Sequence, residues 1–214
     1  GAIPGSARRI SLAADHTPAV VAEASKKLGT KLALHTVDLT DQDDWQDAID
    51  QGIQAGPFVL LFAPNGAVTG HWHSLSSVDE IKRAFVSPTM ADVVKAMQES
   101  KVTLLCAARD NTDGATDAQA SVKAVAALLK NAAAAVVFDP SATDNVRLAA
   151  TLGLKPEERG IATFIVSPRG QIIDRIDGVP TRRQILLGFQ KALASAGGCG
   201  SGCGGGGEGG QSCE

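Results

Sequence analysis

Two stretches of the chain, 104 residues apart, share one pattern: a run of apolar residues, a turn with Pro and Gly, and a second short strand. They are residues 57–66 (PFVLLFAPNG) and 162–170 (ATFIVSPRG). A buried strand, a turn residue pair and a returning strand are typical of a β-hairpin. Aligning Pro64 with Pro168 also aligns Leu61 with Ile165. We infer an internal repeat on the scale of a whole domain, because the period is too long for a solenoid.

The elements predicted around these hairpins occur in nearly the same order in both halves. Each half reads strand, helix, strand, helix, hairpin, helix, from apolar periodicity and from capping and turn residues. An added helix opens the second half. In the first half we expect strands at 8–14, 32–37, 56–62 and 67–72 and helices at 17–28, 40–54 and 77–85. In the second we expect helices at 90–99, 117–130, 145–152 and 181–194 and strands at 102–107, 134–138, 163–166 and 171–176.

Composition excludes several classes of protein. The 214 residues carry a formal net charge of -3, and nucleic-acid or anionic-membrane binders need a concentrated positive field. No apolar run approaches the roughly 18 residues that span a bilayer. We therefore expect a soluble protein, with no nucleic-acid partner and no membrane insertion. It is either cytoplasmic or exported after signal cleavage.

The order of elements and the hairpin phrases resemble the thioredoxin-like fold. The second hairpin is similar to the corresponding strands of the peroxiredoxin and TlpA-like branch. The resemblance implies an α/β fold class: two tandem thioredoxin-like domains, each a mixed sheet flanked by helices. The predicted organisation is a first domain at 8–88, a second at 89–196 and a Gly/Cys-rich tail at 197–214.

The chain departs from this family at the position that carries its chemistry. The resemblance implies a thiolate at the start of the helix after the first strand, where amides and the helix dipole stabilise the anion. No cysteine occupies this place in either half, and we predict no catalytic residue and no enzyme activity by the family route. The matching positions hold Asp15, His16 and Thr17 in the first half and Asn111 and Asp113 in the second.

Two further positions bear on this degenerate site. Pro57 matches the cis-proline that packs beside the thiols in such folds, whereas the second half has Ile161 or Ala162 there. Asp15 beside His16 has two interpretations, an acid-base pair or ordinary helix capping. Capping is favoured, because Asp and Thr are common at helix starts.

Cysteine and histidine supply the candidate metal ligands in the body of the chain. Cys106 lies within a predicted strand, where a cysteine is usually a small buried hydrophobe. His71 and His73 are spaced i and i+2, which on a strand puts both imidazoles on one face. Two imidazoles are an incomplete site for Cu or Zn, and exposed histidines at a strand end are the alternative interpretation.

The segment 197–214 is the most unusual part of the sequence. It holds ten of the 23 glycines and three of the four cysteines, Cys199, Cys203 and Cys213. Its lack of large apolar side chains leaves nothing to offset the entropy of ordering it. Three thiolates are three potential ligands for zinc or a [2Fe-2S] iron-sulfur cluster, each of which takes four. The fourth would come from His71, His73, Cys106 or a partner.

Other interpretations of this tail stay open. A disulfide within it would make a redox relay. Its Gly-Gly-Cys-Gly phrase resembles the swinging arm of sulfur-carrier subunits in thiosulfate oxidation. A disordered end with incidental cysteines is the plainest reading. We predict a non-enzymatic accessory or adaptor subunit whose tail binds a metal or iron-sulfur centre or latches to a partner protein; a redox complex is one such partner. The alternative is a thiol-disulfide relay or sulfur carrier that uses the tail cysteines.

Overall fold

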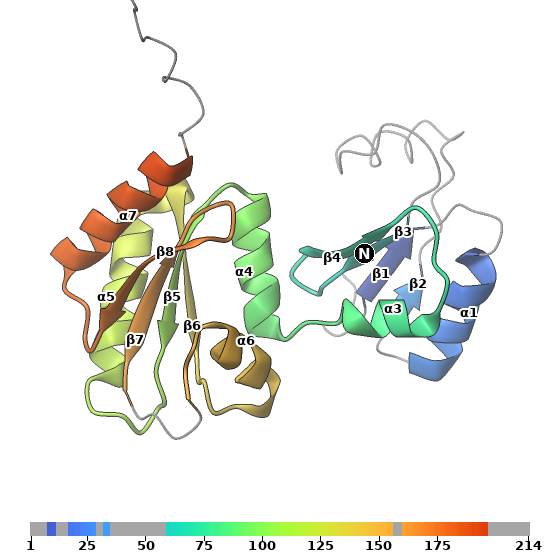
Figure 1. Ribbon diagram of the computed structural model, residues 1–214, viewed down its shortest axis with the longest axis horizontal. Helices are drawn as coiled ribbons and strands as arrows, with labels where there is room; N and C mark the ends of the chain where they lie inside the picture. Colours follow the sequence, from blue (N-terminus) through green and yellow to red (C-terminus); the bar gives the residue numbers. More distant parts are fainter. Residues whose placement is uncertain (1–7, 12–16, 29–31, 35–58, 156–159, 197–214) are drawn as a thin grey trace, which may run out of the picture.

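A computed structural model describes residues 8–11, 17–28, 32–34, 59–155 and 160–196 of the chain. Within these residues the strands form two separate four-stranded sheets (Figure 1). Their strand orders are β2-β1-β3-β4 and β6-β5-β7-β8. In each sheet the first two strands along the chain are parallel and the last two join antiparallel, so both sheets are mixed.

The second sheet is built around one central strand. β5 (Val102–Ala107) pairs in parallel with β6 (Ala133–Phe138) and antiparallel with β7 (Ala162–Val166), and β8 (Ile172–Asp177) forms the outer edge. All six side chains of β5 are buried. This is the expected environment of a strand with neighbours on both sides and helices on both faces.

Helices cover both faces of this sheet, because successive strand side chains point to opposite sides. One core joins Leu104 and Ile165 to α5 (Ala115–Leu129) and α7 (Arg182–Ala196). The other joins Leu105 and Phe164 to α4 (Pro88–Gln98) and α6 (Val146–Thr151). Short 3-10 turns, at Lys130–Ala132 and Thr143–Asn145, complete this half.

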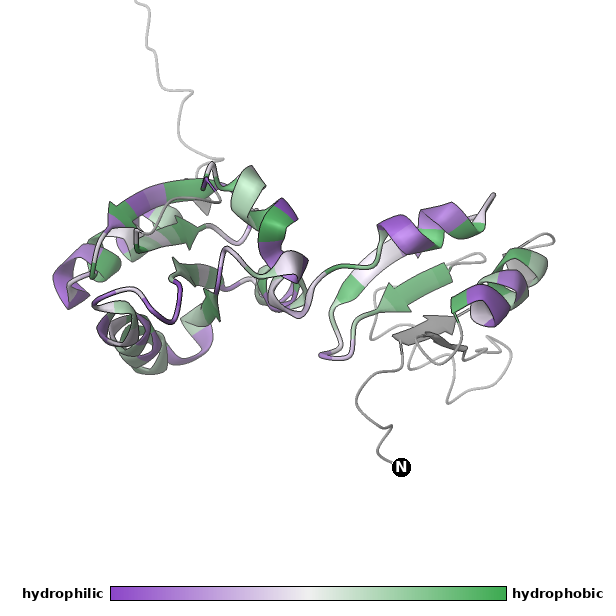
Figure 2. Ribbon diagram, turned by 90° about the horizontal axis from the view of Figure 1, so that it is seen from below, coloured by the Kyte–Doolittle hydropathy of each residue, from purple (hydrophilic) through white to green (hydrophobic). Residues whose placement is uncertain are grey.

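The first sheet is smaller in the described residues. Its strands are β1 (Arg8–Ser11), β2 (Leu32–Leu34), β3 (Val59–Phe62) and β4 (Val68–Trp72). Val59 and Leu61 pack on α1 (Thr17–Leu28) and α3 (Val78–Arg83) in one buried cluster. Figure 2 shows hydrophobic residues along β3 and alternating hydrophobic and hydrophilic stretches on the two helices.

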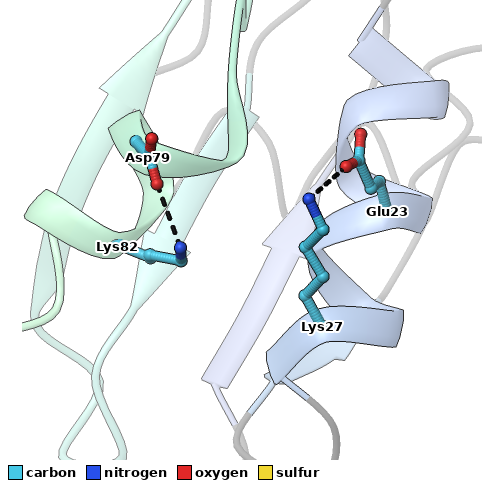
Figure 3. Close-up of polar contacts among 4 residues, drawn as sticks. All are labelled: Glu23, Lys27, Asp79 and Lys82. Carbon is cyan, nitrogen blue, oxygen red and sulfur yellow. Dashed lines mark hydrogen bonds and ion pairs between the residues drawn. The ribbon is translucent and has the colours of Figure 1, made fainter.

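Ion pairs lie on the outer surface of these two helices (Figure 3). Lys27 pairs with Glu23 one turn earlier in α1, and Lys82 with Asp79 in α3 at 3.0 Å. The hydrogen bond that Lys82 donates to Asp79 lowers the pKa of Asp79, and the hydrogen bond that Lys27 donates to Glu23 raises the pKa of Lys27. The stabilisation from Asp79 is therefore present above its unfolded pKa and lost as the pH falls through its folded pKa. All four groups are exposed, and such pairs contribute little to stability.

The two hairpin turns have matching backbone hydrogen bonds. The amide of Gly66 donates to the carbonyl of Ala63, and the amide of Gly170 to that of Ser167, each at 2.9 Å. Gly66 has a φ of 85° and Gly170 a φ of 80°, in the left-handed region that glycine adopts without a steric penalty. The turn geometry therefore repeats at the spacing of 104 residues seen in the sequence.

The strands beside the turns repeat at the same spacing. Each hairpin has a register irregularity one residue before its turn sequence begins. Such bulges increase the local twist and bend of a strand, so they shape both hairpins alike. The irregular steps lie between Leu61 and Phe62 and between Ile165 and Val166.

Two details of the predicted helices differ from the structure. The helix expected from residue 90 begins at Pro88, since Ser87 caps it by accepting a hydrogen bond from the Met90 amide at 3.2 Å. The sequence Ser77-Val78-Asp79-Glu80 predicts a capping box, which is not formed: Ser77 is fully extended and makes no side-chain cap, and Glu80 accepts from the amide of Ser76 at 3.3 Å instead. The predicted helix over 40–54 lies outside the described residues.

Core burial gives a direct test of the second sheet. Leu105 is 1% exposed, whereas Leu128 on α5 is 52% exposed. We expect Leu105→Ala to lower the free energy of unfolding by about 2–5 kcal/mol through lost burial and a cavity. The matched control Leu128→Ala should change it by less than about 0.5 kcal/mol. Urea denaturation followed by circular dichroism measures both, and equal losses would contradict this packing.

Candidate functional site

Several loops of the second half come together at one edge of its sheet. β5 and β6 both end there, at the paired residues Ala107 and Phe138, and β7 begins there at Ala162. The amide of Ala108 extends the ladder by donating to the carbonyl of Phe138 at 3.1 Å. In open α/β sheets, ligands bind outside the carboxyl ends of the parallel strands. This carboxyl edge is therefore the candidate site.

The loop from β5 to α5 forms the centre of the carboxyl edge. The amide of Thr112 donates to Arg109, and the amide of Ala115 donates to Thr112, each at 3.0 Å. Gly114 then precedes α5 with a φ of 82°. A Cβ at Gly114 would lie 2.6 Å from Cγ2 of Val179, so the space as well as the φ favours glycine. The start of α5 is therefore packed tightly against the segment that follows β8.

The two residues of the second half that the resemblance places at the thiol position lie in this loop. Asn111 and Asp113 are both exposed, between the end of β5 and the start of α5. An amide and a carboxylate here can form hydrogen bonds, but neither is a sulfur nucleophile. The described loop therefore has no group for thiol-disulfide exchange.

The corresponding positions of the first half are only partly described. Asp15, His16 and Pro57 lie outside the described residues. The acid-base pair considered for Asp15 and His16 therefore stays a prediction. Thr17 is the first residue of α1. The first half contains no thiol, because the sequence has no cysteine before Cys106.

Cys106 lies inside the second sheet. It is 0% exposed, pairs across the ladder with Thr163, and faces the core formed with α5 and α7. Burial raises the pKa of its thiol. The thiol is therefore protonated near neutral pH and shielded from reagents, which makes it a poor nucleophile. Its burial also removes Cys106 as the fourth ligand considered for a tail-bound metal.

His71 and His73 lie near each other at the end of β4. Both are exposed, and their ring centroids are 5.5 Å apart with an interplanar angle of 53°. In the described part of the chain, no group of three or more His, Cys, Asp or Glu side chains is placed to hold a metal ion. The imidazole pair thus remains two candidate ligands that need others to complete a site.

Sequence reasoning missed the polar residues that shape the loop after β6. Asn145 is 8% exposed, and its amide nitrogen donates to the carbonyl of Asp139 at 3.1 Å. The carboxylate of Asp139 accepts from the amide of Ser141 at 2.7 Å and from its hydroxyl at 2.6 Å. Asp-Pro-Ser is a common turn sequence, which was the available signal. These residues hold the second loop of the carboxyl edge.

The three tail cysteines, Cys199, Cys203 and Cys213, lie outside the described residues. In the part of the chain that is described, no helix combines the length and apolarity needed to cross a membrane.

Comparison with known proteins finds likeness in structure but not in sequence. No protein-family profile matches the chain, and no curated protein matches it. Among solved structures, the first two thioredoxin domains of Saccharomyces cerevisiae Eps1p are 13% identical, with a TM-score of 0.32 over 85% of this chain and 89% of that one. The NTD_N/C domain of the alkylhydroperoxide reductase AhpF from Enterococcus faecalis is 16% identical, with a TM-score of 0.33 over 86% and 91%.

The zinc-bound form of human ERp44 is 12% identical, with a TM-score of 0.33 over 86% of this chain and 53% of that one. Likeness at this level carries no argument about activity or ligands. The fold assignment rests on the chain's own strand order and pairing. These give the mixed sheet flanked by helices that the thioredoxin-like resemblance implied.

Proposed function

We propose that this protein is a non-enzymatic accessory or adaptor subunit made of two tandem thioredoxin-like domains, 8–88 and 89–196. Its tail, residues 197–214, binds a metal or iron-sulfur centre or latches to a partner protein. One observation carries the proposal: the only thiol of the described residues, Cys106, is buried in the sheet, and the loop that would carry a reactive thiol has none. The accessible sulfur chemistry is thereby left to the tail.

The carboxyl edge of the second half supports a binding role over catalysis. Thiol-disulfide exchange needs a thiolate that attacks and a disulfide sulfur that is attacked. Asn111 and Asp113 supply neither, and the first half has no cysteine at all. A thioredoxin-like scaffold without its thiols retains an exposed edge and helical faces, which are surfaces for protein contact.

The tail has the chemistry of a soft-metal ligand set. Cysteine thiolates are preferred ligands of zinc and of iron-sulfur clusters, and three occur within 15 residues of one another. Glycine-rich spacing lets the backbone wrap closely around a bound centre. His71, His73 or a partner residue would supply the fourth ligand.

Replacing the three tail cysteines together tests the proposal. We expect Cys199→Ser, Cys203→Ser and Cys213→Ser in one full-length chain to leave the circular dichroism spectrum unchanged and to abolish bound metal or partner capture. Metal analysis and an ultraviolet-visible spectrum of anaerobically purified protein measure the first, and affinity capture the second. Cys106→Ala is the matched control and should retain both. A triple variant that keeps its metal and its partner would refute the proposal.

The concentration of thiols in one segment also favours the second candidate, a disulfide relay or sulfur carrier. Repeated turnover of a disulfide substrate by the intact chain, lost in the triple variant, would select this candidate. Stoichiometric labelling without turnover would reject it in favour of the adaptor.

The burial of Cys106 predicts its reactivity. In the full-length triple variant, Cys106 is the only thiol, and we expect iodoacetamide to alkylate it roughly a thousandfold more slowly in the native protein than in urea, because reaction requires opening of the fold. Mass spectrometry over time measures the rate. The raised pKa of the Cys106 thiol also predicts how the free energy of unfolding depends on pH. The contribution of this thiol is fully present below its unfolded pKa and is lost as the pH rises through its folded pKa. Rapid alkylation of the native protein would show that the strand is accessible.

A further inference from the structure

Helix α4 contacts the hairpin turns of both sheets. It lies between the two halves, and both turns are directed towards it (Figure 1). Only four residues, 84–87, separate it from α3, and Phe85 and Val86 in this connection are half-buried. The connection between the halves is therefore short and packed, unlike the exposed flexible linkers that usually join domains.

The turn of the first hairpin is hydrogen-bonded to α4 through Asn65. The side-chain amide of Asn65 donates to the carboxylate of Asp92 at 2.7 Å. Its backbone carbonyl accepts from Nζ of Lys95, also at 2.7 Å. The side-chain oxygen of Asn65 accepts from the amide of Ala67 at 3.0 Å, which holds its amide in position. Asn65 is thus hydrogen-bonded to two residues that lie about one turn apart on α4, Asp92 and Lys95.

Gln98 binds the backbone of β4 one turn further along α4. Its Oε1 accepts from the amide of Val68 at 3.0 Å, and its Nε2 donates to the carbonyl of Val68 at 2.8 Å. β4 is an edge strand, so this side-chain amide satisfies backbone groups that a neighbouring strand would otherwise pair.

Small apolar residues let the hairpin and the helix approach closely. Ala63 and Ala67 of the first turn are buried against Ala91 of α4, with Val86 and Val94 beside them. Alanine has little side-chain entropy to lose on burial. The polar contacts between the turn and α4 are therefore accompanied by a buried apolar contact.

A neighbouring face of α4 holds the second half. Met90, Val93 and Met97, spaced three and four residues apart, pack on the core of the second sheet. The Cε atom of Met97 lies so close to the second turn that a Cβ at Gly170 would be 2.7 Å from it. The equivalent turns of both hairpins therefore meet one helix.

We propose that α4 is a clamp that holds both hairpin turns and makes the two sheets one rigid body. In each sheet the hairpin turn and the carboxyl ends of the parallel strands lie at opposite ends of the same strands. The clamp therefore holds the two carboxyl edges at a constant separation. This inference concerns the body of the protein and does not depend on the chemistry of the tail.

Nuclear magnetic resonance of the full-length protein tests the clamp. In the wild-type chain we expect residual dipolar couplings from residues 59–83 and 102–155 to fit one alignment tensor, with a single rotational correlation time. In Lys95→Ala with Gln98→Ala, we expect two tensors and shorter correlation times for each half. The Val68 amide should exchange with solvent about tenfold faster, which corresponds to the loss of one hydrogen bond.

The matched control is Lys123→Ala with Gln190→Ala, which changes exposed residues of α5 and α7 and should behave as wild type. Unchanged amide shifts in β5 show that the clamp variant is folded. Two tensors in the wild-type protein would overturn the proposal whether or not any variant folds. A clamp variant that folds and keeps one tensor would overturn the role of these side chains.

Discussion

The complete burial of β5 is the constraint on which the second half of this protein depends. All six of its side chains lie in the core, so the strand needs a hydrogen-bonded neighbour on each side and a helical layer on each face. β6 and β7 supply the neighbours, and two pairs of helices supply the layers. The chemistry of Cys106 follows from the same burial, because a thiol in this strand is desolvated and held protonated.

The position of the strand also decides what the carboxyl edge can do. β5 ends beside β6 and delivers the chain to α5, so the loop between them lies where a helix start could stabilise an anion. In this chain the loop carries an amide and a carboxylate, at Asn111 and Asp113, and a glycine that packs against Val179. The strand, the loop and the helix are therefore all present in this half, and the loop carries no sulfur.

Much of the fold was predictable because its signals are local. Pro and Gly in the turns, the apolar runs before them and the reciprocal Thr181 and Gln184 cap of α7 all act within a few residues. The start of α4 and the cap of α3 were predicted wrongly. Whether α4 begins at Pro88 or at Met90, and whether Glu80 accepts from the amide of Ser76 or of Ser77, depends on backbone angles that the residue types alone leave open.

The sequence by itself determined the repeat of the hairpins, the absence of a cysteine before Cys106 and the concentration of cysteines at 197–214, since each is a matter of residue identity and spacing. Only the tertiary structure decided that Asp139 and Asn145 hold a loop of the carboxyl edge and that α4 meets both turns. The contacts of α4 with Asn65 and Val68 join residues about 30 positions apart. The apolar and polar pattern of a helix predicts which of its faces are buried. Which segments pack against those faces is set by how the sheets pack in space.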